Sequence, residues 1–331
     1  MIARPVKRTA YICFLVLFLL TMLAVLSAPA QQSRSVAYIA DQTLNAVLVI
    51  NTQTGQPMAH IKVGSVPLGV ALSPDGARLY VANTSSNTIS VVDTASLAVV
   101  QTIAVGNLPT FVAMTPNGAS AYVSNQADNT VSVVDTSTMT VVATVAVGNG
   151  PTGVAVTPNG EFVYVTNNGY TEASDTVSVI STASNSVVAT VITPEVPIDV
   201  AITPNGAFAY VVSDISPGLV SVIDTATNTV TATVTVGIDP NGIAISQNGT
   251  SAYVGNGGSS SISVISLASN TVTATVPIAS GNGVILPAVS SDSTRVYISD
   301  GSSVSVLKAS TNRVIDSFRE HGVLGAIALA P

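Results

Sequence analysis

The sequence predicts an all-β protein, a seven-bladed β-propeller of four-stranded antiparallel blades. Three observations support this fold: a short phrase that recurs with a period near 42 residues, strand-like segments between turn residues, and a C-terminal segment that completes the first repeat. The phrase begins with a tyrosine and reads Tyr-Val-Thr-Asn or a close variant. Its seven copies begin at Tyr38, Tyr80, Tyr122, Tyr164, Tyr210, Tyr253 and Tyr297.

One repeat contains four segments with the composition of β-strands. In the clearest copy these are Gly153–Val156, Phe162–Asn167, Thr176–Ile180 and Val187–Val191. Each is rich in Val, Ile, Thr or Tyr and is bounded by turn-forming residues, which is typical of strands. A period near 42 therefore accommodates four strands and four turns.

The turn after the first strand has a defined chemistry. In four repeats it reads Ser/Thr-Pro-Asp/Asn-Gly, with proline where φ is near −65° and glycine where φ is positive. Aspartates such as Asp93, Asp135 and Asp224 end the third strand, where a short acceptor can bond the turning backbone. We assign these aspartates to structure.

The two ends of the repeat region complement each other. The first repeat begins at its Tyr38 segment without the preceding apolar strand, and the chain finishes with a copy of that strand at 325–331. We therefore expect 326–330 to pair with 36–40 and close the ring, which removes two open sheet edges.

The first thirty residues have the layout of an export signal. Arg4, Lys7 and Arg8 precede an apolar run from Ala10 to Leu26, and small residues at 28–30 offer a cleavage site. The run is short for a membrane span, so a cleaved signal is favoured over a retained anchor. The predicted organisation is a signal peptide at 1–30 and a propeller at 31–331, periplasmic or secreted to the cell surface, with no membrane span after cleavage.

Charge and cysteine content exclude several functions. The chain has a formal net charge of −7, and no Lys or Arg occurs between Arg78 and Arg295. Nucleic-acid binding depends on cations that neutralise phosphates, so no nucleic-acid partner is expected. Cys13, the only cysteine, lies in the signal, so the exported part has neither disulfides nor a haem-attachment motif.

The repeat phrases resemble the YVTN-family β-propeller repeat. They read Pro-x-Gly-Val-Ala-x-Ser/Thr-Pro-Asp/Asn-Gly, then Tyr-Val-x-Asn, Asn-Thr-Val/Ile-Ser-Val-Val/Ile-Asp-Thr and Val-x-Ala-Thr-Val/Ile-x-Val-Gly, over essentially all of 31–331. The resemblance implies a propeller like those of periplasmic YncE-like and archaeal surface-layer proteins, related to lactonase-like and haem d1-associated propellers. Some YncE-like proteins are linked to single-stranded DNA, but this chain lacks, across its middle repeats, the basic and aromatic groove residues that such binding needs.

Candidate ligand-binding residues lie where the channel mouth is expected. By analogy with other propellers, the first strand of each repeat should be innermost, and the loop entering it should share a face with the loop between the second and third strands. Glycine recurs near the start of that strand, but Phe111 and Asp199 interrupt the pattern. They form either an asymmetric ligand site or a tolerated variation. His321, in the loop before the last strand, is the histidine that could reach this face, whereas His60 falls in an outer strand.

Acidic residues in neighbouring loops are candidate metal ligands. Asp128, Glu172, Asp175 and Asp214 follow the second strands of three adjacent repeats and could hold Ca²⁺ through oxygen ligands. The sequence has no compact Asp-x-Asp-x-Asp pattern, so an ordinary solvated loop face is the alternative. No other cofactor is expected.

The predicted function is therefore a binding or interaction scaffold at the cell envelope or surface, without catalysis. Its partner would be a protein, a small molecule or a glycan bound at one propeller face. One alternative is a lactonase-like hydrolase or a haem d1-associated protein that uses the channel mouth. Another is a structural surface-coat subunit, and the sequence leaves the oligomeric state open.

Overall fold

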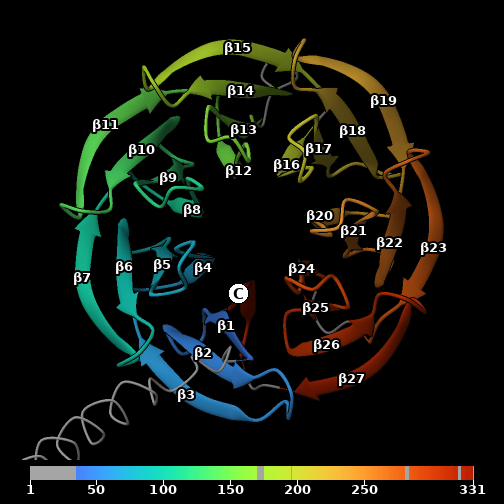
Figure 1. The fold of residues 1–331 in the computed structure, drawn as a ribbon, viewed down its shortest axis with the longest axis horizontal. Coiled ribbons are helices and arrows are strands. Elements are labelled where there is room, and N and C mark those ends of the chain that lie inside the picture. The colour runs from blue at the N-terminus through green and yellow to red at the C-terminus, as the bar shows by residue number, and fades with distance from the viewer. Residues whose placement is uncertain (1–34, 170–174, 195, 280–282, 320–321, 331) are drawn as a thin grey trace, which may run out of the picture. The chain divides into compact units, whose positions relative to one another are not determined.

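The strand-forming segments assemble into a closed ring of blades in the computed structural model (Figure 1). The structure describes residues 35–169, 175–194, 196–279, 283–319 and 322–330, so the predicted signal peptide, Glu172 and His321 lie outside the described residues. In the described part, twenty-eight strands form seven four-stranded antiparallel sheets. We number the blades 1 to 7, from the sheet β28-β1-β2-β3 to the sheet β24-β25-β26-β27.

The inner strands surround the central axis (Figure 1). Most begin with a proline that ends the preceding loop and fixes φ at the first strand position. In blade order they are β28 (Leu324–Leu329), β4 (Pro67–Leu72), β8 (Pro109–Met114), β12 (Pro151–Val156), β16 (Pro197–Ile202), β20 (Pro240–Ile245) and β24 (Leu286–Val289).

The second strands carry the repeated tyrosine, which is at most 3% exposed in every blade. They are β1 (Val36–Asp41), β5 (Arg78–Asn83), β9 (Ser120–Asn125), β13 (Phe162–Asn168), β17 (Phe208–Ser213), β21 (Ser251–Asn256) and β25 (Arg295–Ser299). The third strands are equally buried, which explains their Val and Ile content. They are β2 (Ala46–Asn51), β6 (Thr88–Asp93), β10 (Thr130–Asp135), β14 (Asp175–Ser181), β18 (Leu219–Asp224), β22 (Ser261–Ser266) and β26 (Ser303–Lys308).

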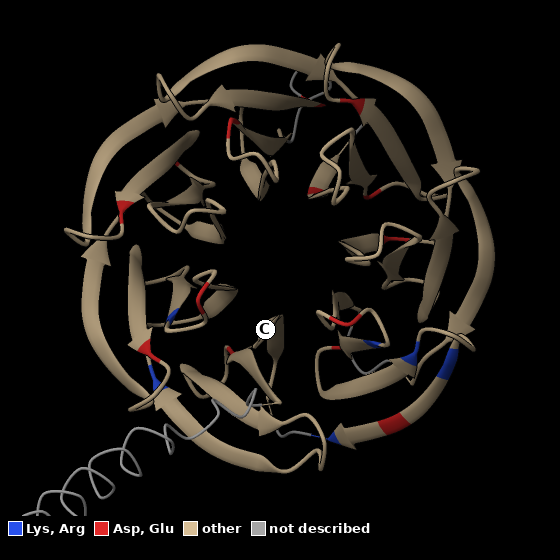
Figure 2. Ribbon diagram, viewed as in Figure 1, with Lys and Arg blue, Asp and Glu red and all other residues tan. Residues whose placement is uncertain are grey.

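The outer strands form the exposed rim, and each has a β-bulge at its second or third residue. In blade 3, Val133 pairs with Ala143 and Val134 with Val141, so Val142 is left out of the ladder and is 57% exposed. Such bulges blunt an open sheet edge. The strands are β3 (Pro57–Lys62), β7 (Ala98–Ala104), β11 (Thr140–Ala146), β15 (Ser186–Ile192), β19 (Thr229–Thr235), β23 (Thr271–Pro277) and β27 (Arg313–Arg319). Charged residues of the rim lie in β27 and β3, and the other outer strands have none (Figure 2).

The ring closes as predicted. β28 pairs antiparallel with β1, with Ala37 opposite Leu329 and Ile39 opposite Ile327. The last strand of the chain is thus the inner strand of the first blade, and neither β28 nor β1 is left with an open edge on that side.

The core consists of seven apolar clusters, each formed between the facing sheets of two neighbouring blades. Between blades 2 and 3, for example, Tyr80 and Val91 pack with Val112, Val123 and Val134. Because each blade is covered on both faces, its buried strands carry apolar side chains on both sides.

The loops divide between two faces of the ring. The inlet face holds the loops that lead into the inner strands and the loops between second and third strands, which hydrogen-bond to each other, as in Thr84 N to Val66 O at 3.0 Å. The turn face holds the turns after the inner strands and the turns before the outer strands, joined for example by Thr94 Oγ1 donating to Gly76 O at 2.7 Å. The predicted grouping of the inlet loops is confirmed.

Candidate functional site

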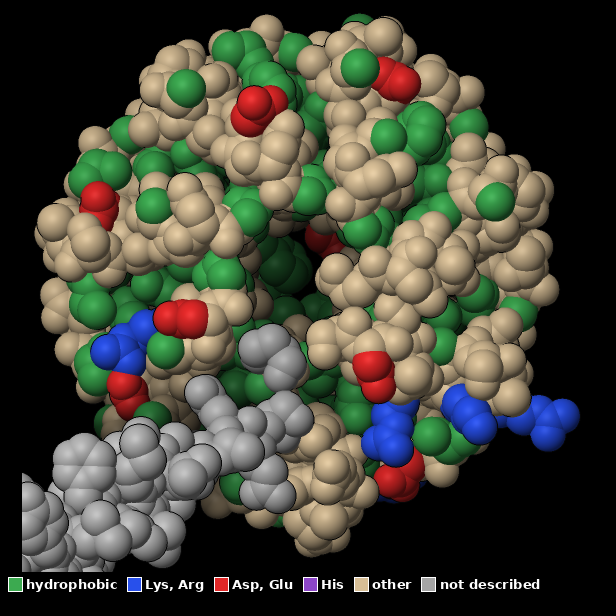
Figure 3. Space-filling model, viewed as in Figure 1, with side chains coloured by type: hydrophobic (Ala, Val, Ile, Leu, Met, Phe, Trp, Pro, Cys, Tyr) green, Lys and Arg blue, Asp and Glu red, His purple; other side chains and the backbone are tan. Residues whose placement is uncertain are grey.

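The channel mouth was predicted to hold the ligand site, and the space-filling view shows a central opening lined mainly by hydrophobic side chains with an acidic group inside (Figure 3). In the seven inner strands, all of which are described, Asp199 is the single charged residue. It is the third residue of β16 and is half-buried. From the sequence, this strand was expected to start at Asp199. In the structure it starts two residues earlier, at Pro197.

Asp199 links blade 5 to blade 6. Its Oδ2 accepts a hydrogen bond from the backbone N–H of Ile243 in β20 at 2.9 Å, and its Oδ1 accepts one from Val200 N, also at 2.9 Å. Burial raises the pKa of Asp199 to about 7, although both backbone donors act to lower the pKa. The carboxyl group is therefore a structural link that titrates near neutral pH.

Phe111 lies on β8, with β12 between it and Asp199 in the ring, so the two predicted site residues are not brought together. Its ring packs with the core between blades 3 and 4, and its backbone N–H donates to Ser124 Oγ at 3.2 Å. Phe111 is thus a packing residue as well as a neighbour of the channel.

Large residues and glycines alternate around the inner ring. A Cβ built on Gly69 would lie 2.7 Å from the Cα of Phe111, and one built on Gly153 would lie 2.7 Å from the Cα of Asp199. On Gly242 it would lie 2.7 Å from Leu286 Cδ2. Each large residue therefore depends on a glycine in the preceding blade. Blades 1 and 2 break the alternation, because Gly325 and Gly69 both occupy this position.

A belt of hydrogen bonds links inner strands to neighbouring blades, and its donors and acceptors vary around the ring. Thr152 Oγ1 donates to Ile198 O at 2.8 Å between blades 4 and 5, and Ser299 Oγ donates to Gly325 O at 2.7 Å between blades 7 and 1. Asn241 Oδ1 accepts from Ile285 N at 3.3 Å between blades 6 and 7. The Asp199 contact is one member of this belt, which the sequence did not reveal.

The described acidic candidates lie on the inlet face in three adjacent blades, as predicted, but are engaged locally. Asp128 accepts hydrogen bonds from Asn107 N and Nδ2 at 2.7 and 2.8 Å, and these hold its pKa below the usual value. Asp175 Oδ1 accepts from Val196 N at 3.0 Å. Burial and the nearby Asp239 raise the pKa of Asp214. The described residues contain no group of three His, Cys, Asp or Glu side chains that could hold a metal ion.

Two further features bear on the predictions. His60 is exposed on the outer strand β3, as the sequence indicated. In the described ranges no helix has the length and apolar character to cross a membrane.

Comparison with known protein families shows which family the chain belongs to. The family model for the choice-of-anchor I domain matches residues 126–293, just over half of the sequence. The chain belongs to the choice-of-anchor I domain family. The model described as "Lactonase, 7-bladed beta-propeller" matches residues 33–152 of this choice-of-anchor I protein. No curated protein matches it.

Solved structures similar to this choice-of-anchor I protein share its fold. Hydrazine synthase of Kuenenia stuttgartiensis is 22% identical with a TM-score of 0.74, over 87% of this chain and 93% of the other. A functionally unknown protein of Desulfotomaculum acetoxidans DSM 771 is 19% identical with a TM-score of 0.78, over 89% and 99%. The dihydro-heme d1 dehydrogenase NirN, solved in complex with DHE, is 13% identical with a TM-score of 0.68, over 92% and 78%. At these identities the similarity shows the fold alone.

Proposed function

We propose that this protein is an exported, YncE-like binding scaffold that holds a protein partner on its inlet face and catalyses no reaction itself. One observation carries the proposal. The hydroxyl, amide and carboxyl groups around the inner ring, which a catalytic site would use, are hydrogen-bonded between neighbouring blades. Groups committed in this way rigidify a scaffold.

The inlet loops supply a contact surface. The inlet loops and the strand ends that lead into them carry exposed large apolar residues around the ring, which are available for contact with a partner. These residues are Leu44, Leu108, Ile192, Ile238, Val284 and Val323, with exposures from 40% to 81%. Val66 and Val196, in the same set of loops, have φ of +52° and +56°, a conformation that is costly for β-branched residues. Backbone strain of this kind is concentrated at ligand-contacting segments.

A photo-crosslinking experiment tests the partner surface. A photoreactive amino acid at Leu108 in the full-length protein, expressed in its host, is expected to yield a discrete protein adduct. The same group at Val142, exposed on the outer strand of the same blade, is the matched control and should yield none. Equal adducts at both positions, or none at Leu108, would contradict the proposal.

Export is tested separately. Cell fractionation and mass spectrometry of the N-terminus are expected to find the protein outside the cytoplasm and beginning after Ala30. A cytoplasmic protein with an intact N-terminus would refute this part of the proposal and leave the inlet-face test unaffected.

A second candidate function is a lactonase-like or haem d1-associated activity at the channel. It is favoured by Asp199, whose raised pKa near neutrality suits a general base, and by the lactonase model match at 33–152. A Soret band, stoichiometric metal such as Ca²⁺ that a chelator removes, or lactone hydrolysis lost in Asp199→Asn would favour this candidate over the scaffold.

A further inference from the structure

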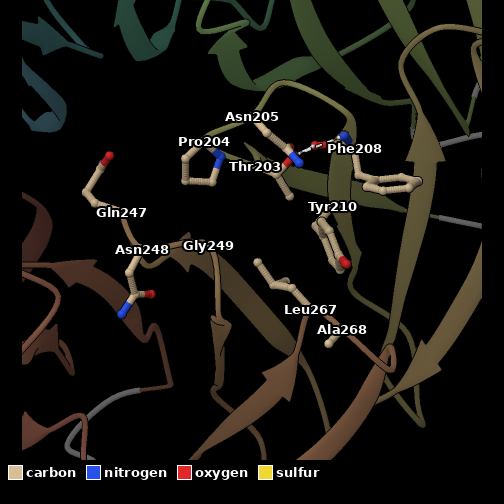
Figure 4. Close-up of a pocket in the computed structure, with 10 residues that line it drawn as sticks. All are labelled: Thr203, Pro204, Asn205, Phe208, Tyr210, Gln247, Asn248, Gly249, Leu267 and Ala268. Carbon is tan, nitrogen blue, oxygen red and sulfur yellow. Dashed lines mark hydrogen bonds between the residues drawn. The ribbon is translucent and has the colours of Figure 1, made fainter.

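A pocket on the turn face, opposite the predicted channel-mouth site, lies between blades 5 and 6 (Figure 4). Its volume is about 340 Å³, near the lower end of the ~300–1,000 Å³ range of small-molecule sites. The turn after β16, the turn after β20 and the turn before β23 supply most of its lining. A pocket of this size accommodates one ring-sized ligand or the end of a longer chain.

The packing of successive turns is looser at this pocket. A Cβ built on Gly118, Gly160 or Gly206 would lie 3.4 Å from the Cδ of the proline in the preceding turn. At the junction of blades 5 and 6 the corresponding distance, from Gly249 to Pro204 Cδ, is 4.0 Å. Gln247 also replaces the proline that four other turns carry at this position. The turn loses its rigid ring and gains an amide.

The pocket combines an apolar floor with an uncharged polar rim. Leu267 and Pro204 line the hollow together with Tyr210, which is 1% exposed, and Gln247 and Asn248 extend from the turn at its edge (Figure 4). No charged residue lines it. Tyr210 is already committed, because its hydroxyl donates to Asn270 Oδ1 at 2.5 Å.

The rim amides have hydrogen-bonding capacity to spare. Asn248 Oδ1 accepts from Thr250, but its Nδ2 has no hydrogen bond within the described residues, and neither does the side chain of exposed Gln247. Amide groups both donate and accept, which matches ligand hydroxyls that do the same. The apolar floor suits the C–H face of a sugar ring, and an uncharged lining offers no compensation for a buried ionic ligand.

We propose that this pocket binds a neutral pyranose, as a free sugar or as the end residue of a glycan. The site is independent of the inlet face, so the two proposals can fail separately.

The test uses the full-length protein and the methyl glycosides of glucose, galactose, mannose and N-acetylglucosamine. At least one is expected to give saturation-transfer NMR signals from its ring protons. Ala268→Trp places a large ring at the exposed edge of the pocket and should weaken that affinity about tenfold or more, which corresponds to ~1.4 kcal/mol. Ala226→Trp, at the equivalent exposed position of blade 5, is the matched control and should leave it unchanged.

The remaining outcomes are decisive. Unfolding temperatures should be equal for both variants, and Gln247→Ala, which removes one rim amide without adding bulk, should also weaken binding. No signal from any of the glycosides, equal binding by Ala268→Trp and Ala226→Trp, or binding of N-acetyltyrosine amide in place of the sugars would each overturn the proposal. If Ala268→Trp loses glycoside binding while the photoreactive group at Leu108 still forms its protein adduct in the same variant, the two faces act separately.

Discussion

The hydroxyl of Tyr164 in blade 4 donates a hydrogen bond to Oδ1 of Asn228 in blade 5, 2.7 Å away and 64 residues further along the chain. Asn228 has φ of +54°, and Tyr122 and Tyr210 make the same bond to asparagines with φ of +49° and +53°. Asparagine is one of the few residues that adopt this conformation readily. The tyrosine of the repeat therefore clamps each of these blades to the next.

Tyr164→Phe should lower the free energy of unfolding by about 1 kcal/mol, because a single neutral hydrogen bond is lost. Tyr80→Phe is the matched control, since the Tyr80 hydroxyl has no hydrogen-bond partner among the described residues and Met139 occupies the position of the asparagine. Urea unfolding of both variants measures the difference. Equal losses would show that the hydroxyl bond is not what stabilises the interface.

The stability of the protein should fall as pH rises from about 5 to 7, because of Asp199. Its pKa is about 7 in the folded state against 3.8 for the unfolded chain, so the folded state holds a proton that the unfolded state has released. The stabilisation is full when the pH is below the pKa of Asp199 in the unfolded chain. It is lost as the pH rises through the pKa of Asp199 in the folded state. Because Asp199 is only half-buried, we expect about 1–2 kcal/mol over this range.

Asp199→Asn should abolish this slope in thermal unfolding followed against pH. Asp128→Asn is the control of opposite sign, because the pKa of Asp128 is lowered and its contribution is lost as pH falls. A slope unchanged in Asp199→Asn would assign the titration to another group.

Gly153→Ala should destabilise the protein by roughly 1–3 kcal/mol, as overpacking does. The added Cβ would lie 2.7 Å from the backbone Cα of Asp199, which no side-chain rotation can relieve. Gly242→Ala should cost less, because its close contact is Cδ2 of Leu286, the end of a flexible side chain. Denaturation midpoints of the two variants test this order, and a reversed order would refute the backbone-contact explanation.

Removal of residues 323–331 should open the ring. It deletes β28, its pairing with β1 and the Ser299 hydrogen bond to Gly325 O. We expect a lower unfolding temperature and self-association through the exposed edge of β1, measured by calorimetry and light scattering. Removal of Pro331 alone, which keeps the strand, should change neither. A truncated protein that stays monomeric with an unchanged unfolding temperature would contradict the role of the closing strand.

The sequence predicted the blade count, the strand order and the closure because each depends on local composition or on the repeat period. The pairing of 326–330 with 36–40 followed from a strand missing at one end and present at the other. These features need no knowledge of distances between blades.

The details of the site depend on such distances and could not be predicted. The bond from Ile243 N to Asp199 crosses from one blade to the next, and nothing local to Asp199 reveals its partner. The turn-face pocket lies where the distance between successive turns increases from 3.4 to 4.0 Å. Its one visible signal was Gln247 in place of proline, which the sequence shows only as a weaker turn.

The alternation of glycine and a large residue around the inner ring also constrains how this architecture can evolve. A pattern with a repeat of two needs an even number of members, so a closed ring of seven must leave one mismatch, here where Gly325 and Gly69 are neighbours. Duplication of a single blade would change the parity and create or remove such a mismatch. Duplication of blades in pairs would preserve every existing partner, so growth of the propeller by pairs conserves its innermost packing.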